Sequence, residues 1–385
     1  MDDFARALVS LGVRRGSKVA IWATNVPAWF ITFWAATKIG AVLVTVNTAY
    51  KIHEAEYLLR QSDTHTLVMI DHCLDSNYRE IIQTLCPELA DAKPGSALHC
   101  RKLPFLRNVI TVGFRMPGCL TFDEAMDRAN MVPREQILRM AAGVRPDDVC
   151  NMQYTSGTTG FPKGVMLTHR NIVSNVKATL ECVSPKVGDT FLSFLPLSHT
   201  FERTAGYYLA LATGCIIAYN RSVLLLAEDL KTIKPTVIIS VPRVYERIYA
   251  RVQDKLRKSR PIAKKLFDWA VEVGWRDFCR KNHLPVEKSG RSWLDGIVRA
   301  TLLHKMANTL LSQFGGRLRI AISGGAALNH KVARTFCGLG LPIIQGYGMT
   351  EASPIIAGNC VEFNQPDTVG KPFCNVEIRL GEGNE

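Results

Sequence analysis

The chain has 385 residues, of which 47% are hydrophobic and 21% charged, with 28 Gly and 18 Pro. This length exceeds one minimal domain, and the composition excludes disordered, collagen-like and coiled-coil chains. The formal net charge is +13, which raises the question of an anionic partner. The 11 Cys include no C-x-x-C pair, so we expect a reducing, cytoplasmic environment and neither a disulfide framework nor a four-ligand zinc site.

The first third of the chain alternates between helical and strand patterns. The predicted helices cover residues 4–11, 27–37 and 54–61, and the predicted strands cover 18–22, 41–46, 66–70 and 108–112. Gly40 divides the apolar stretch 26–46 into pieces too short to span a membrane, so we expect a buried helix followed by a buried strand. Residues 87–104 are expected to form a surface loop. The alternation predicts a parallel sheet with crossover helices over residues 1–145.

A second series of α/β elements follows. Its strands are predicted at 150–154, 165–168, 190–194, 215–218, 236–241, 318–323 and 341–345, and its helices at 172–182 and 204–213. We assign residues 146–345 to this second unit, with a basic helical insert at 243–314. After Val369, apolar residues alternate with charged ones at Val376, Ile378 and Leu380, which predicts an antiparallel strand. The expected architecture is therefore two doubly wound α/β subdomains, with the beginning of a small β-barrel at 346–385.

Most of the excess positive charge lies in the insert. Residues 251–305 contain fourteen Lys or Arg against six Asp or Glu. Two interpretations are open: a solvated face of the helical insert, which we favour slightly, or peripheral attachment to the inner face of an anionic membrane. Nucleic acid is not an expected partner, because no recognised module or array of stacking aromatic residues accompanies the charge.

A loop rich in Gly and hydroxyl groups lies between two predicted strands, in the sequence YTSGTTGFPKG of residues 154–164. Unhindered amides, hydroxyl donors and one Lys are what a loop around a polyphosphate requires. A Walker A loop needs Gly directly before Lys and Ser or Thr directly after it, whereas Pro162 and Gly164 occupy these positions. The segment therefore indicates an anion-binding loop of another kind.

Two further glycine clusters follow predicted strands. Residues 323–327 (SGGAA) lack large side chains, so a flat group such as a nucleobase can approach the backbone closely, although a tight strand-to-helix turn explains them equally well. In residues 345–351 (QGYGMTE), Tyr347 can stack on a base, Thr350 can donate to a phosphate and Glu351 can hold Mg²⁺.

These segments, together with residues 195–199 (LPLSH), resemble the motifs of the adenylate-forming superfamily, specifically the AMP-forming acyl-CoA synthetases. The resemblance covers nearly the whole chain. Residues 195–208 (LPLSHTFERTAGYY), residues 241–248 (VPRVYERI) and the basic insert resemble the branch of long-chain fatty acid–CoA ligases.

The resemblance implies a set of site residues. The ATP phosphates would be held by Thr155, Ser156, Gly157, Thr158, Thr159, Gly160 and Lys163, and adenine would be bracketed by Gly324, Gly325, Ala326, Gln345, Gly346, Tyr347 and Gly348. Thr350 would contact the α-phosphate and the substrate carboxylate, and Glu351 would coordinate Mg²⁺. His199 would lie between the acyl pocket and the nucleotide, in a positioning role. The residues implied to take part in catalysis are thus Lys163, His199, Thr350 and Glu351.

The implied reaction activates a fatty acid with ATP to an acyl-adenylate, from which CoA displaces AMP. Such chemistry needs electrostatic stabilisation and no protein nucleophile. Three alternatives remain: a catalytically incomplete protein that binds nucleotide or acyl groups, an adenylating enzyme for another carboxylic acid such as an amino or aryl acid, and a luciferase-like oxidase.

The resemblance also implies parts that the chain lacks. Members of the superfamily have a preceding strand, a ribose-binding aspartate, a hinge and a mobile C-terminal cap domain with a catalytic lysine. We therefore expect a chain truncated at both ends, which binds ATP but turns over poorly.

Overall fold

The computed structural model describes residues 1–155, 162–286, 292–341 and 343–382. The chain divides into two compact units. Unit 1 comprises Met1–Val173 and Pro196–Thr200, and unit 2 comprises Ser174–Leu195 and Phe201–Glu385. The boundary that we expected near residue 145 therefore falls later in the chain, at Val173.

Unit 1 is built around a seven-stranded sheet with the order β7-β6-β3-β1-β2-β8-β9. All its neighbouring strands are parallel except β8 and β9. The strands are β1 (Lys18–Trp22), β2 (Val42–Thr45), β3 (Thr64–Met69), β6 (Asn108–Thr111), β7 (Leu120–Thr121), β8 (Val149–Thr155) and β9 (Lys163–Thr168), with a small separate pair, β4 (His72–Cys73) and β5 (Ser76–Asn77). The helices are α1 (Asp2–Ser10), α2 (Pro27–Lys38), α3 (Ile52–Gln61), α4 (Tyr78–Leu85), α5 (Phe122–Asp127) and α6 (Arg134–Ala142), with the short 3₁₀ turns η1 (Pro87–Ala90) and η2 (Arg128–Met131).

The central strands of unit 1 are short, apolar and buried, as parallel strands covered on both faces must be. On one side the core includes Trp22, whose ring stacks on Tyr78 with centroids 4.0 Å apart. Helix α2 begins with Pro27 at its first turn, where a missing N–H costs nothing. The helix and strand that we predicted from the apolar stretch 26–46 are confirmed.

The hairpin of β8 and β9 belongs to the first sheet, and our assignment of these strands to the second α/β set is wrong. Strand β8 pairs in parallel with β2, in the register Leu43 to Asn151. The buried Asn151 amide donates to Leu43 O at 2.9 Å, and Thr45 Oγ1 bonds to Gln153 Oε1 at 2.7 Å. These polar contacts fix the pairing, and they join residues more than a hundred positions apart.

Unit 2 contains a second seven-stranded sheet, with the order β11-β10-β12-β13-β14-β15-β16. The strands β10 to β14 run parallel, and β15 and β16 are antiparallel. The strands are β10 (Thr190–Ser193), β11 (Ile216–Tyr219), β12 (Val237–Ser240), β13 (Ile320–Ser323), β14 (Ile343–Gly348), β15 (Ile355–Gly358) and β16 (Lys371–Pro372). The remaining elements are α7 (His169–Cys182), which begins in unit 1, the π-helix η3 (Glu202–Tyr208), α8 (Leu209–Ala212), η4 (Val223–Leu225), α9 (Leu226–Ile233), α14 (His330–Gly338) and η6 (Thr350–Ala352).

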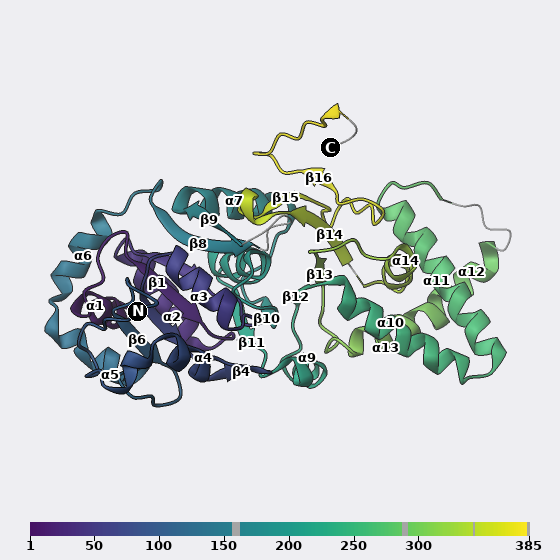
Figure 1. The fold of residues 1–385 in the computed structure, drawn as a ribbon. Helices are drawn as coiled ribbons and strands as arrows, with labels where there is room; N and C mark the ends of the chain where they lie inside the picture. The colour runs from purple at the N-terminus through teal and green to yellow at the C-terminus, as the bar shows by residue number, and fades with distance from the viewer. Residues whose placement is uncertain (156–161, 287–291, 342, 383–385) are drawn as a thin grey trace. The chain divides into compact units, whose positions relative to one another are not determined.

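The basic insert forms the helices α10 (Pro242–Arg257), α11 (Pro261–Lys281), α12 (Ser292–Val298), η5 (Arg299–Leu303) and α13 (His304–Ser312), drawn in green in Figure 1. The longest of them, α11, packs closely on α14. A Cβ atom at Gly274 would lie 1.7 Å from Gly338 O, so the two helices cross where neither carries a side chain.

Two predicted segments differ from the structure. Residues 87–104 are not simply a surface loop, because Leu89, Leu98, Cys100 and Leu103 are buried in the core of unit 1. Residues 376–380 form no strand: the exposed fractions of Ile378 and Leu380 are 49% and 69%, and no neighbouring strand pairs with them in the described part of the chain. Alternation alone cannot form a strand without a partner.

The structure contains a disulfide bond that we did not expect. It joins Cys182 at the end of α7 to Cys360, which follows β15, with the two Cα atoms 5.0 Å apart. Asn175 holds these segments together, since its side-chain amide donates to Ile355 O at 2.7 Å and accepts from Ile355 N at 3.2 Å. The two cysteines are 178 residues apart, so no local spacing in the sequence predicts the disulfide.

Candidate active site

The β8–β9 hairpin carries the predicted phosphate-binding loop of unit 1. Thr155 and Lys163 pair across the hairpin, so the residues at the two ends of the loop are neighbours, and the Lys163 side chain is exposed. A Cβ atom on Gly164 would lie 3.2 Å from the Tyr154 ring, which explains the small residue there. Five of the predicted residues lie outside the described part of the chain: Ser156, Gly157, Thr158, Thr159 and Gly160.

The segment that contains His199 is held in unit 1 by two amide side chains that residue type and spacing did not single out. Gln153 donates through Nε2 to Ser198 O at 2.5 Å, and Asn25 Oδ1 accepts from Leu197 N at 3.0 Å. His199 itself is exposed at a turn closed by a hydrogen bond from its N–H to Pro196 O. The backbone around this histidine is thus fixed while its ring is accessible, which suits a positioning role.

In unit 2 the two glycine clusters emerge next to each other. Ser240, Ser323 and Gln345 are aligned across β12, β13 and β14 near the carboxyl ends of these strands. Gly324, Gly325 and Ala326 therefore leave the sheet beside Gly346 and Tyr347. In open α/β sheets, the carboxyl ends of parallel strands are where ligands bind.

The first of these clusters is shaped by a phenylalanine that the sequence did not single out. A Cβ atom on Gly324 would lie 2.7 Å from the Phe201 ring, so this glycine allows the ring to pack on the backbone. The next residue, Gly325, has φ +81°, which strains any residue with a side chain. Gly325 and Ala326 are exposed and leave the strand end open to a flat ligand.

Gln345 plays a different part from its neighbours. Its side chain is buried, accepts from Leu328 N at 2.8 Å and donates to Pro366 O at 2.5 Å. The side-chain amide is therefore committed to holding two loops, and only the backbone remains for a ligand. Tyr347, by contrast, is 46% exposed, and its ring is accessible for stacking.

Gly348 and the residues after it form a tight turn. A Cβ atom on Gly348 would lie 2.2 Å from Pro354 O, so no larger residue fits. Thr350 is half-buried and Glu351 is exposed, both in the turn η6. One exposed carboxylate fits Mg²⁺, which is usually bound through one or two protein carboxylates together with substrate phosphates and water.

A buried carboxyl group, that of Glu202, follows His199 by three residues in the sequence. Glu202, in the π-helix η3, is 1% exposed, and burial raises its pKa to about 8. π-Helical turns occur often at functional sites. A Cβ atom on Gly206 would lie 2.8 Å from Glu202 Oε1, so the glycine makes room for the carboxyl group.

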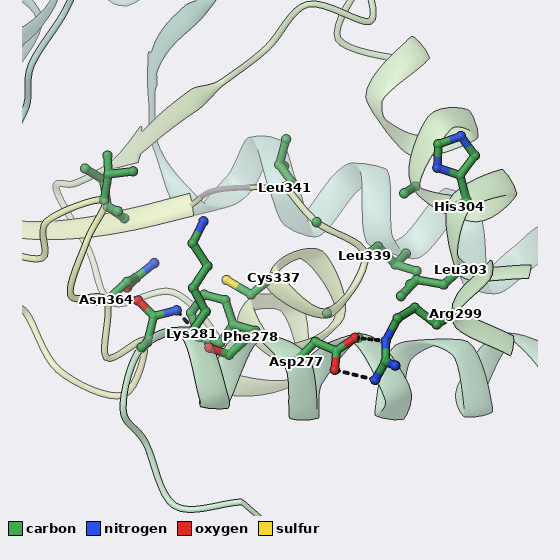
Figure 2. A pocket seen from close by; sticks show the side chains of 17 residues that line it. Asp277, Phe278, Lys281, Arg299, Leu303, His304, Cys337, Leu339, Leu341 and Asn364 are labelled. Atoms are coloured by element: carbon green, nitrogen blue, oxygen red, sulfur yellow. Dashed lines mark hydrogen bonds and ion pairs between the residues drawn. The ribbon is translucent and has the colours of Figure 1, made fainter. Parts of the chain in front are cut away.

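A separate cavity of about 440 Å³ opens in unit 2 (Figure 2). It lies between α11, the η5–α13 helix and the turn before β14, and it is lined by Phe278, Leu303 and Leu341 among others. The ion pair of Asp277 and Arg299 closes one side, with Arg299 Nη2 2.6 Å from Asp277 Oδ1. The cavity adjoins the amino end of β14 and contains none of the predicted site residues.

A model of the family described as AMP-binding enzyme matches residues 1–385. The chain belongs to the AMP-binding enzymes. The resemblance to the adenylate-forming superfamily is thereby confirmed, although the positions of the individual site residues stay predictions.

Three proteins with similar sequences or structures can be compared with this AMP-binding enzyme. A putative acyl-CoA synthetase, YngI of Bacillus subtilis, is 38% identical over 244 residues, which are 63% of this chain and 44% of the relative. The long-chain-fatty-acid–CoA ligase FadD15 of Mycobacterium bovis is 29% identical over 99% of this chain and 59% of its own length. A crystal structure of the anthranilate CoA ligase AuaEII in complex with anthranoyl-AMP has a TM-score of 0.69 at 21% identity and covers 99% of this chain and 60% of that one.

This AMP-binding enzyme thus spans about half the length of the curated relatives it matches. The likeness to the solved structure confirms the predicted mixed α/β fold with parallel sheets. Among the helices of the described residues, none combines the length and the apolar character that crossing a bilayer requires.

Proposed function

We propose that this AMP-binding enzyme takes part in activating a long-chain fatty acid with ATP, first to an acyl-adenylate and then to an acyl-CoA. The observation that carries the proposal is the alignment of Ser323 with Gln345, because it brings the two glycine clusters to one edge of the sheet. The names of the relatives support the substrate class, since FadD15 is a long-chain-fatty-acid–CoA ligase.

The chemistry follows from the weakness of a carboxylate as an electrophile. The fatty acid carboxylate attacks the α-phosphorus of ATP, pyrophosphate leaves, and the thiolate of CoA then displaces AMP from the acyl-adenylate. Both steps gain from donors and cations arranged around the developing charge. Mg²⁺, held by Glu351 and phosphate oxygens, would neutralise part of that charge.

Roles are proposed for the residues of each unit separately. In unit 1, Thr155, Lys163 and the loop between them would bind the phosphates, and His199 would orient the reacting groups. In unit 2, Gly324, Gly325 and Ala326 would face one side of adenine, with Tyr347 stacked on it and Thr350 near the α-phosphate. Because the Gln345 side chain is engaged by Leu328 N and Pro366 O, we assign it the support of this edge rather than contact with the base.

Nucleotide binding provides the most direct test of these roles. Lys163→Ala should weaken ATP binding about ten- to a hundredfold, because one charge-assisted hydrogen bond is lost. Glu351→Ala should weaken binding only in the presence of Mg²⁺. Isothermal titration calorimetry with ATP, with and without Mg²⁺, measures both, and the exposed residues in Lys102→Ala and Glu377→Ala serve as matched controls. Unchanged affinity in both site variants would refute the assignment.

A pyrophosphate-release assay distinguishes between substrate classes. With ATP and Mg²⁺, we expect palmitate or laurate to give more release than anthranilate, the acid of the solved relative. Preference for anthranilate would favour an aryl-acid ligase instead. Binding of ATP without release from any acid would favour the alternative of a nucleotide-binding protein without turnover.

A further inference from the structure

A cluster of metal-ligating side chains lies in unit 1 and includes none of the predicted active-site residues. The sulfur atoms of Cys86 and Cys100 and a carboxylate oxygen of Glu88 all lie within 4.8 Å of one another. The two thiols are buried, with exposed fractions of 0% and 3%, whereas Glu88 is half-buried at the rim. Among the described residues, no other group of three such side chains comes this close together.

The backbone holds the three residues in place. Cys86 directly follows α4, and Glu88 lies in the next turn, η1. The chain returns at Cys100, whose thiol donates to Leu85 O at 3.4 Å. One residue later, Arg101 N donates to Glu88 Oε1 at 3.1 Å. Two hydrogen bonds therefore fix the approach of residues 100 and 101 to the end of α4.

One carboxylate oxygen of this cluster, Glu88 Oε2, is fully shielded from solvent. Apart from the weakly donating thiols of Cys86 and Cys100, which interact with the Glu88 carboxylate, no described residue donates a hydrogen bond to this oxygen. Buried polar atoms are almost always satisfied by protein, water or an ion, and a carboxylate oxygen is costly to leave bare. A cation bound next to the two sulfur atoms would satisfy it.

We propose that Cys86, Cys100 and Glu88 form a zinc site, with water as the fourth ligand on the rim where Glu88 is half-exposed. Zn²⁺ is bound tetrahedrally by thiolate, imidazole and carboxylate groups, whereas Ca²⁺ and Mg²⁺ take oxygen ligands alone. Bonds of about 2.3 Å to sulfur place two thiolates about 3.8 Å apart, so modest side-chain rotation closes the site. Binding releases the two thiol protons, and the ion closes the loop from residue 86 to residue 100 against α4.

Cobalt substitution tests this site in the 385-residue chain. The metal-free, fully reduced protein is titrated with Co²⁺, and the thiolate-to-cobalt charge-transfer band is followed in the near ultraviolet. We expect a one-to-one end point and displacement by Zn²⁺. In Cys86→Ser and Cys100→Ser the band should be lost, and in Glu88→Gln affinity should fall at least tenfold. Cys119→Ser is the matched control, since Cys119 is a buried free cysteine of the same core.

Two further measurements keep the proposal falsifiable if a cysteine variant fails to fold. Zinc should raise the melting temperature of the parent chain and of Cys119→Ser. In the parent chain, zinc should also protect Cys86 and Cys100 from alkylation, as mapped by peptide mass spectrometry. Absence of a thiolate band in the reduced parent chain would overturn the site. So would a band that persists in both cysteine variants, or a Cys86–Cys100 disulfide in a protein that binds no metal after reduction.

Discussion

Asp189 is a buried carboxylate in unit 2 that receives hydrogen bonds from three separate segments. Arg319 donates to Oδ1 from Nε at 2.9 Å, Thr236 donates to the same oxygen from Oγ1 at 2.7 Å, and Lys186 N donates to Oδ2 at 2.6 Å. Burial alone would raise the pKa of this carboxyl group, but the hydrogen bonds from Arg319, Lys186 N and Thr236 outweigh it and lower the pKa to about 2. The folded state therefore favours the ionised form of the Asp189 carboxyl group.

A pKa lowered from 3.8 to about 2 makes stability depend on pH. The contribution is fully present above about pH 4 and is lost as pH falls toward 2, because the unfolded chain then binds the proton first. Asp189→Asn should lower the free energy of unfolding by roughly 2 kcal/mol at pH 7 and by less at pH 3. Urea denaturation at both pH values measures this. Asp254→Asn, in an exposed ion pair, should change stability by less than about 0.5 kcal/mol, and an equal loss at both pH values would contradict the argument.

The predicted site residues differ in how much of their role can be inferred from residue type and spacing alone. Residue type and spacing predict ligand contacts for Lys163, Tyr347 and Glu351, which are exposed in the structure, and these roles stay predictions. For Gln345 the same signals miss that the side chain is engaged by two loops distant in sequence. Phe201 was not predicted as a site residue. Its part in shaping the glycine cluster depends on its contact with Gly324, and this contact is seen only in the folded chain.

At the scale of elements, the crossing of α11 and α14 depends on two glycines. A Cβ atom on Gly274 would lie 1.7 Å from Gly338 O, and one on Gly338 would lie 2.7 Å from Val271 O. Both contacts are with backbone, which cannot move aside as a flexible side chain can. The helices can approach this closely only with glycine on both sides.

Gly274→Ala should therefore destabilise unit 2 despite the higher helix propensity of alanine. We expect a loss of about 1–3 kcal/mol, typical of an overpacked interior. Gly296→Ala is the matched control, since this glycine lies in helix α12 with nothing within 4 Å of a new Cβ atom. It should be neutral or stabilise by up to about 1 kcal/mol. Equal melting temperatures for the two variants would contradict this prediction. They would show that α11 and α14 accommodate the new methyl group without loss of stability.

Local patterns predicted most of the strands, some of them to the residue, but several helices, among them α4, α6 and α14, were not predicted. Strand β1 covers Lys18–Trp22 as expected, because a short apolar run between polar residues has few other solutions in an α/β fold. Local patterns do not predict which strands pair with each other. Strand β8 joins β2 through Asn151 and Gln153, and nothing near these residues in sequence indicates β2. The Cys182–Cys360 disulfide was missed for the same reason.

For the molecule as a whole, the charge of the basic insert is partly neutralised within unit 2. Asp295 accepts from Arg276 at 2.8 Å, and Asp277 accepts from Arg280 at 2.7 Å and from Arg299 at 2.6 Å. The apolar side of α10 is also engaged, since Ile248, Val252 and Leu256 pack against the core of the unit. An interfacial helix needs a free apolar face, and α10 does not present one.

We therefore expect the insert to behave as a solvated surface. The protein should co-sediment with anionic vesicles at low salt and lose most of that binding at physiological ionic strength, where charges are screened beyond about 8 Å. Neutral vesicles give the baseline. Co-sedimentation that withstands physiological salt on anionic but not neutral vesicles would establish membrane docking instead.

The disulfide between Cys182 and Cys360 encloses the whole basic insert in one covalent loop. Lys and Arg are abundant there, so a trypsin-like protease finds many peptide bonds to cut between the two cysteines. After such a cut, the portion of the chain before the break and the portion after it stay joined through sulfur. A nicked molecule would then keep the mass of an intact one until a reductant separates its pieces, so damage in this region would be visible only under reducing conditions.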